Sequence, residues 1–86
     1  MVEKNVVVTN ETGLHARPAA ALVQFVKAMP GDVELIKEGK VANAKSIFSV
    51  MSSGISKGTE ITVRVNGENE EENLNKVVEF IEGLTD

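Results

Sequence analysis

Cysteine, tryptophan and tyrosine are missing from the 86 residues of this chain, and phenylalanine occurs only three times. Without cysteine there is neither a disulfide nor a thiolate metal site, which suits a reducing compartment. Three phenylalanines offer too few stacking surfaces for a protein that binds nucleic acid through its bases. The formal net charge of −4 also argues against general nucleic-acid binding.

Long apolar runs are missing as well. No such run could cross a bilayer, and residues 1–5 lack the apolar segment of a signal peptide. The hydrophobic fraction of 42% is that of an ordinary globular domain. We therefore expect a single domain over residues 1–86 that is cytoplasmic, is not inserted in a membrane and is a monomer by default.

The hydrophobic pattern predicts four strands and three helices in the order β-α-β-β-α-β-α. Strands are expected at residues 4–9 and 59–65, and as a hairpin on either side of the turn at residues 37–40. Helices are expected at residues 16–27, directly after Ser46, and from about residue 69 to residue 83. This order fits an α+β open-faced β-sandwich, a four-stranded antiparallel sheet with three helices on one face.

Two polar patterns indicate where helices begin. Ser46 precedes a short apolar segment and is a good N-cap residue. Asn69, with Glu72 three residues later, fits a capping box. The acidic residues at 70–72 also suit the positive end of a helix.

The only histidine lies in the stretch Gly13–Ala20, two residues before one of the two arginines. Pro18 fits the opening turn of a helix, so this helix is expected to begin at or just after His15. An imidazole, the Arg17 guanidinium and main-chain N–H groups would converge there. This combination favours an anion or phosphoryl site.

Other interpretations of His15 remain open on these residues alone. A single histidine near a helix start is more often a cap or a solvated side chain. A metal site is the weakest alternative, because a second histidine and cysteine are both absent. Phosphoryl transfer needs positioning and charge stabilisation, which a small domain can provide, but the chain has no P-loop. We expect no metal, no cofactor and no self-sufficient enzyme, so a phosphoryl carrier is the more natural form of such a site.

Two motifs, GLHARPA at residues 13–19 and NAKSIF at residues 43–48, resemble those of the HPr family. HPr is the histidine-containing phosphocarrier of the phosphoenolpyruvate-dependent sugar phosphotransferase system. The resemblance covers essentially the whole chain. It implies that His15 accepts a phosphoryl group on Nδ1 from phosphorylated enzyme I and passes it to IIA proteins or domains of sugar permeases. Arg17 would stabilise the phosphate together with the main-chain N–H groups of Ala16 and Arg17.

The resemblance also assigns a regulatory role to Ser46. It implies phosphorylation there by an ATP-dependent HPr kinase/phosphorylase, and binding of the phosphorylated form to the catabolite-control repressor CcpA. On physical grounds alone Ser46 is only a helix cap. The docking surface that the family uses would comprise Ala20, Gln24, Lys27, Ile47, Phe48 and Met51. The alternative is core filling for the apolar members and a solvated charge for Lys27.

Two further functions stay open. The chain could be mainly a regulatory phosphoserine interaction domain of the co-repressor type with little carrier activity, or a small-molecule-binding module. Within the family, the regulatory paralogue Crh keeps the serine but lacks the histidine. The presence of His15 therefore favours a carrier.

Overall fold

Seven strands and helices follow one another in the predicted order. The computed structural model describes residues 1–85. Its elements are β1 (Val2–Val7), α1 (Ala16–Val26), β2 (Asp32–Lys37), β3 (Lys40–Asn43), α2 (Ile47–Ser52), β4 (Glu60–Asn66) and α3 (Glu70–Glu82). The order β-α-β-β-α-β-α is confirmed, although β1 begins and ends two residues before the predicted strand at residues 4–9.

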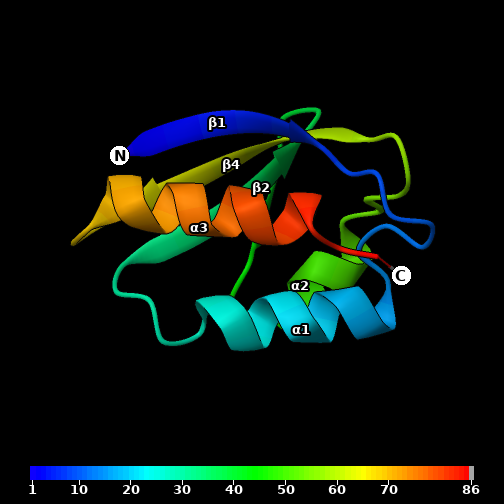
Figure 1. The fold of residues 1–86 in the computed structure, drawn as a ribbon, viewed down its shortest axis with the longest axis horizontal. Coiled ribbons are helices and arrows are strands. Elements are labelled where there is room, and N and C mark those ends of the chain that lie inside the picture. Colours follow the sequence, from blue (N-terminus) through cyan, green and yellow to red (C-terminus); the bar gives the residue numbers. More distant parts are fainter. Residues whose placement is uncertain (86) are drawn as a thin grey trace.

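The four strands form one antiparallel sheet in the order β1-β4-β2-β3. Ile61, Val63 and Val65 alternate with more exposed residues along β4, and all three are buried. Val33 and Leu35 of β2 pair with Val65 and Val63, so these side chains share one face of the sheet. The helices lie along that face (Figure 1), which confirms the α+β open-faced sandwich.

Helices α1 and α3 supply the other half of the core through one apolar stripe each. The stripes consist of Pro18, Ala19, Leu22 and Val26 on α1, and of Leu74, Val77, Val78 and Ile81 on α3. Full burial of one large aliphatic side chain contributes about 1.5–3 kcal/mol. Since its buried stripe fixes α1 against the core, the start of this helix has a well-defined place on the surface.

The predicted hairpin around residues 37–40 is confirmed. Glu38 and Gly39 connect β2 to β3 with φ angles of 50° and 81°, and Lys37 pairs with Lys40 across the turn. Positive φ at both central residues is the requirement of a type I′ turn, whose twist matches that of the two strands.

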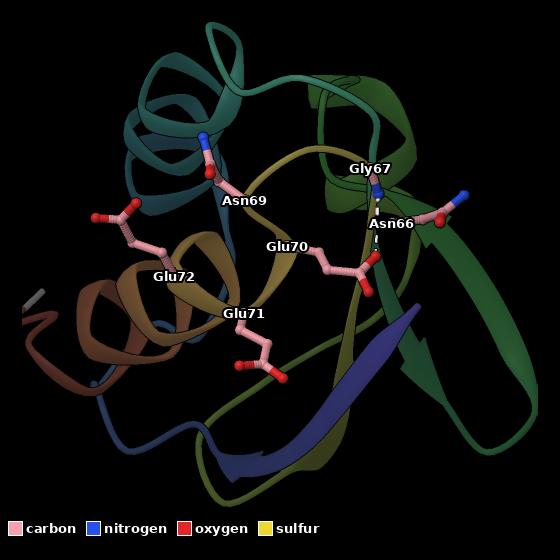
Figure 2. A pocket seen from close by; sticks show the side chains of 6 residues that line it. All are labelled: Asn66, Gly67, Asn69, Glu70, Glu71 and Glu72. Atoms are coloured by element: carbon pink, nitrogen blue, oxygen red, sulfur yellow. Dashed lines mark hydrogen bonds between the residues drawn. The ribbon is translucent and has the colours of Figure 1, made fainter.

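The predicted capping box at the start of α3 is wrong. Asn69 is left-handed, with φ 58° and ψ 33°, and its side chain makes no capping hydrogen bond. An N-cap side chain reaches the helix N–H groups from an extended backbone, which Asn69 does not have. Instead, Glu70 Oε2 accepts a hydrogen bond from the Gly67 N–H at 3.2 Å, as Figure 2 shows.

The other carboxylate oxygen of Glu70 ties the start of the chain to this loop. Glu70 Oε1 accepts a hydrogen bond from the N-terminal ammonium of Met1 at 2.8 Å. This bond and the one from the Gly67 N–H hold the pKa of the Glu70 carboxyl below its ordinary value. The first strand and the last helix are therefore joined by a contact between residues 69 positions apart.

Gly31 lies where the loop after α1 touches the loop after β4. Its φ is +77°, and an added Cβ would lie 1.8 Å from the carbonyl oxygen of Asn66. No side chain fits there, because the obstructing atoms belong to the main chain. This close approach fixes the loop after α1 against the end of β4.

Candidate functional site

His15 is the N-cap residue of α1, as the sequence predicts. Its backbone is extended, with φ −79° and ψ −170°, and its side chain makes no capping hydrogen bond. The His15 carbonyl oxygen accepts the first bond of the helix, from the Ala19 N–H at 2.8 Å. Helix geometry then leaves the N–H groups of Ala16 and Arg17 without an intrahelical acceptor, whereas Pro18 has no N–H to satisfy.

The side chains expected at the phosphoryl site meet at one place on the surface. Thr12, His15, Ala16, Arg17 and Pro18 line a single open hollow at the start of α1. The His15 and Arg17 side chains are both exposed. An imidazole, a guanidinium and the positive end of a helix are therefore available to one anion approaching from solvent.

A second hollow, drawn in Figure 2, lies at the opposite end of the molecule from His15. Asn66, Gly67, Asn69 and the three glutamates at 70–72 line it, around the start of α3. Its carboxylates would repel a phosphate, although a helix begins there too. Of these two hollows, the one at α1 thus has the charge that suits a phosphoryl group.

The loop before His15 rests on a brace segment, which we define as Ile55–Thr59 and which follows α2. Gly13 has φ +62°, and an added Cβ would lie 2.5 Å from Ser56 Cα and 2.6 Å from the Ile55 carbonyl oxygen. The Leu14 N–H donates to that oxygen at 3.0 Å. The sequence does not reveal this contact, because a contact between two irregular loops leaves no periodic pattern.

An ion pair extends the contact between the loop and the brace segment. Lys57 Nζ lies 2.9 Å from Glu11 Oε1. The hydrogen bond from Lys57, aided by its charge, lowers the pKa of the Glu11 carboxyl. Both side chains are largely exposed, so solvent screens the attraction between them. The ion pair therefore adds little to the stability of the fold.

Ser46 caps α2 as predicted. Its backbone is extended, and its Oγ accepts a hydrogen bond from the Ser49 N–H at 3.2 Å. The neighbouring Lys45 fixes this segment to the loop after α1, because its Nζ donates to the carbonyl oxygens of Met29 at 2.5 Å and Gly31 at 2.7 Å. Ser46 and the loop after α1 are thereby held close together.

Replacing Ser46 with alanine is expected to lower the free energy of unfolding by about 1 kcal/mol, because the Ser49 N–H loses its acceptor. Urea denaturation followed by circular dichroism would measure the loss. Ser52→Ala is the matched control, since the Ser52 hydroxyl donates only to carbonyl oxygens within the same exposed helix. Equal stability of the two variants would show that the cap contributes nothing.

The apolar residues expected on the docking surface are exposed. Phe48 has 81% of its surface exposed, Ile47 43% and Met51 44%, whereas Val50 is the buried residue of α2. The core-filling alternative is therefore wrong for all three. Exposed apolar side chains gathered on one short helix are typical of a surface that contacts other proteins.

The docking residues expected on α1 lie on the helix that α2 packs against. Gln24 and Lys27 are exposed, whereas Ala20 is half-buried. Lys27 also ends the helix, where its N–H donates to the Val23 carbonyl oxygen. The surfaces of α1 and α2 thus border each other.

Two properties of residues 1–85 bear on other classes of function. Within them, no three histidine, aspartate or glutamate side chains gather into a group that could hold a metal ion. None of their helices is long and apolar enough to span a membrane.

Comparison with known proteins supports the resemblance to HPr. A family model described as the PTS HPr component phosphorylation site matches residues 2–83. The HPr-like protein Crh of Bacillus subtilis is 46% identical over 82 residues, which make up 95% of this chain and 96% of Crh.

Solved structures of HPr proteins share the fold. HPr-C-His from Thermoanaerobacter tengcongensis has a TM-score of 0.90 and 40% identity, covering 95% of this chain and 92% of its own. The phosphocarrier protein HPr from Bacillus anthracis has a TM-score of 0.87 and 40% identity, covering 92% of this chain and 94% of its own.

The expectation of a monomer does not fit all of these relatives. HPr from Thermoanaerobacter tengcongensis has a structure as a dimer, and so does Crh from Bacillus subtilis. The family model spans nearly the whole chain and the relatives share 40% to 46% of its residues, so this chain belongs to the HPr family.

Proposed function

We propose that this protein is a phosphocarrier of the sugar phosphotransferase system, with His15 as the residue that carries the phosphoryl group. The observation that supports this most directly is the exposed imidazole at the open start of α1, in one hollow with Arg17. Such a site can take up a phosphoryl group from one protein and present it to another. Uptake and delivery of the phosphoryl group would take place in the cytoplasm.

The transfer needs only one bond change at this chain. The lone pair of His15 Nδ1 attacks the phosphorus atom, and the bond from phosphorus to the donor group of enzyme I breaks, with its electron pair returning to enzyme I. The same change in the opposite sense passes the phosphoryl group to a IIA protein or domain. Arg17 and the N–H groups of Ala16 and Arg17 offset the charge on the phosphoryl oxygens. The chain is thus a carrier and not an enzyme in the usual sense.

The proposed docking surface lies on α1, the helix that begins at the hollow, and on α2, which packs against α1. Ile47, Phe48 and Met51 supply its apolar part, and Ala20, Gln24 and Lys27 supply its border on α1. A small apolar patch with a polar edge suits contacts that form and dissolve quickly. Enzyme I and the IIA proteins would use this surface in turn.

Ser46 is the proposed regulatory site. Transfer of the ATP γ-phosphoryl group to Ser46 Oγ by an HPr kinase/phosphorylase would add a charge of roughly −2 at the start of α2. The Ser49 N–H already points at this oxygen and would stabilise the phosphate. A dianion at the edge of the docking surface would disfavour acidic partners and slow phosphorylation of His15.

Similarity to Crh favours a second candidate function. Crh is 46% identical to this chain, more than the two HPr structures at 40%. The alternative is a regulatory domain of the co-repressor type, in which phosphorylated Ser46 binds CcpA and His15 is little used.

Two labelling reactions separate these candidates. With phosphoenolpyruvate, Mg²⁺ and enzyme I, we expect acid-labile phosphate on the wild-type protein and none on His15→Ala. With ATP and HPr kinase/phosphorylase, we expect acid-stable phosphate that Ser46→Ala abolishes. Label in the second reaction alone would establish the regulatory domain, and label in neither would overturn both candidates.

A further inference from the structure

We propose that Asn10 is a positioning residue for His15, because its side chain fixes the peptide group from which the His15 segment starts. The inference rests on the proposed carrier function. Asn10 is a buried polar residue five positions before His15, and its role is to set the orientation of the imidazole.

The peptide group between Gly13 and Leu14 is held at both of its polar atoms. Asn10 Nδ2 donates to the Gly13 carbonyl oxygen at 2.8 Å, and this bond is buried. On the other side, the Leu14 N–H donates to the Ile55 carbonyl oxygen at 3.0 Å. A peptide group is planar, so two bonds on opposite edges fix both its place and its orientation.

The chain is anchored again immediately after this peptide group. Leu14 is only 2% exposed and belongs to the hydrophobic core. One residue later, the His15 carbonyl oxygen accepts the first bond of α1 from the Ala19 N–H. His15 therefore lies between two fixed points, with few main-chain torsions left to vary.

The imidazole depends on this anchoring because its side chain makes no capping hydrogen bond. The direction of its Cα–Cβ bond is set by the main chain alone. A displacement of about 1 Å can cost a reaction of this kind roughly a hundredfold in rate. We therefore expect a looser segment before His15 to slow phosphoryl transfer more than it weakens docking.

Gly13 explains why a side chain is needed here. Its contact with the main chain of Ser56 allows no Cβ, and its φ of +62° favours glycine. Glycine also gives the loop the greatest freedom to move. The buried Asn10 amide, 4% exposed, restricts that freedom from within the loop.

The chain contains a matched control. Asn73 is also buried, at 6% exposure, and its Nδ2 likewise donates to a main-chain carbonyl oxygen, that of Glu68. That bond lies at the start of α3, at the opposite end of the molecule from His15 (Figure 1). Asn10→Ala and Asn73→Ala thus remove the same kind of group from two places.

Rapid-quench phosphorylation by enzyme I would compare the variants at a temperature where each is folded. We expect Asn10→Ala to lower kcat about tenfold with KM unchanged. The His15 imidazole is then no longer held in position, whereas the docking surface is intact. Asn73→Ala should keep both constants of the wild type. Asn10→Asp, which keeps the shape but loses the donor, should behave as Asn10→Ala. Equal kcat values for the Asn10 and Asn73 variants would overturn the inference.

Amide hydrogen exchange tests the same inference without a partner. Exchange of the Leu14 N–H should become at least about tenfold faster in Asn10→Ala and stay unchanged in Asn73→Ala. Unchanged exchange in both would overturn the positioning role even if the wild type is a good carrier. A wild type that takes no label from enzyme I would instead overturn the proposed function, whatever the exchange at Leu14.

Discussion

Replacing Gly31 with alanine is expected to lower the free energy of unfolding by about 2–5 kcal/mol. The new Cβ would lie 1.8 Å from the Asn66 carbonyl oxygen and 2.8 Å from its carbonyl carbon. Relief requires the loops after α1 and β4 to separate. The left-handed backbone, with φ +77°, adds a cost of its own because alanine rarely adopts it.

Comparison with Gly39→Ala isolates the steric part of this effect. Gly39 has nearly the same φ, +81°, but nothing lies within 4 Å of an added Cβ. Its replacement should cost only about 1–2 kcal/mol, the cost of the backbone conformation. Urea unfolding of both variants would measure the two losses. Equal losses would contradict the importance of the contact with Asn66.

Leu14→Ala is expected to lower the free energy of unfolding by about 2–5 kcal/mol. Leu14 is 2% exposed and packs in the core, so its truncation leaves a cavity below the loop that carries His15. Phosphorylation of His15 should slow as well, since the segment loses one of its anchors. Chemical denaturation and enzyme I-dependent labelling would measure the two effects.

Phe48→Ala is the control for this variant. Phe48 is 81% exposed, so its truncation should change stability by no more than about 0.5 kcal/mol. If Phe48 belongs to the docking surface, the KM for enzyme I should rise while the protein stays fully folded. The two variants would therefore separate loss of the core from loss of a contact surface. An unstable Phe48→Ala with normal KM would contradict both assignments.

Local patterns in the sequence predict most of the elements. The alternation of Ile61, Val63 and Val65 indicates β4, and the turn at residues 37–40 indicates the hairpin between β2 and β3. These features depend on neighbours in the chain, so their residues suffice to predict them. The same holds for Ser46 and His15, which lie directly before helices as N-cap residues do.

Long-range geometry is what the sequence does not reveal. The failed capping box at Asn69 is an example, because the Met1 ammonium and the Gly67 N–H both bind Glu70 and the loop adopts a different path. The bond from Asn10 to Gly13 is short in sequence, but the peptide group that it holds also binds the brace segment beyond α2. The residues of the candidate site could thus be predicted from their motif, whereas the contacts that hold them could not.

The strand order β1-β4-β2-β3 has a consequence for how the chain folds. The β2–β3 hairpin closes locally and can form in about 1–10 μs. Val2, by contrast, pairs with Val65, so β1 must wait until β4 has been made. During synthesis at about 5–20 residues per second, β1 stays unpaired for seconds. Lys4, which shares a face with Val63 but is exposed, places a charge on this strand and disfavours its pairing with other nascent chains in that interval.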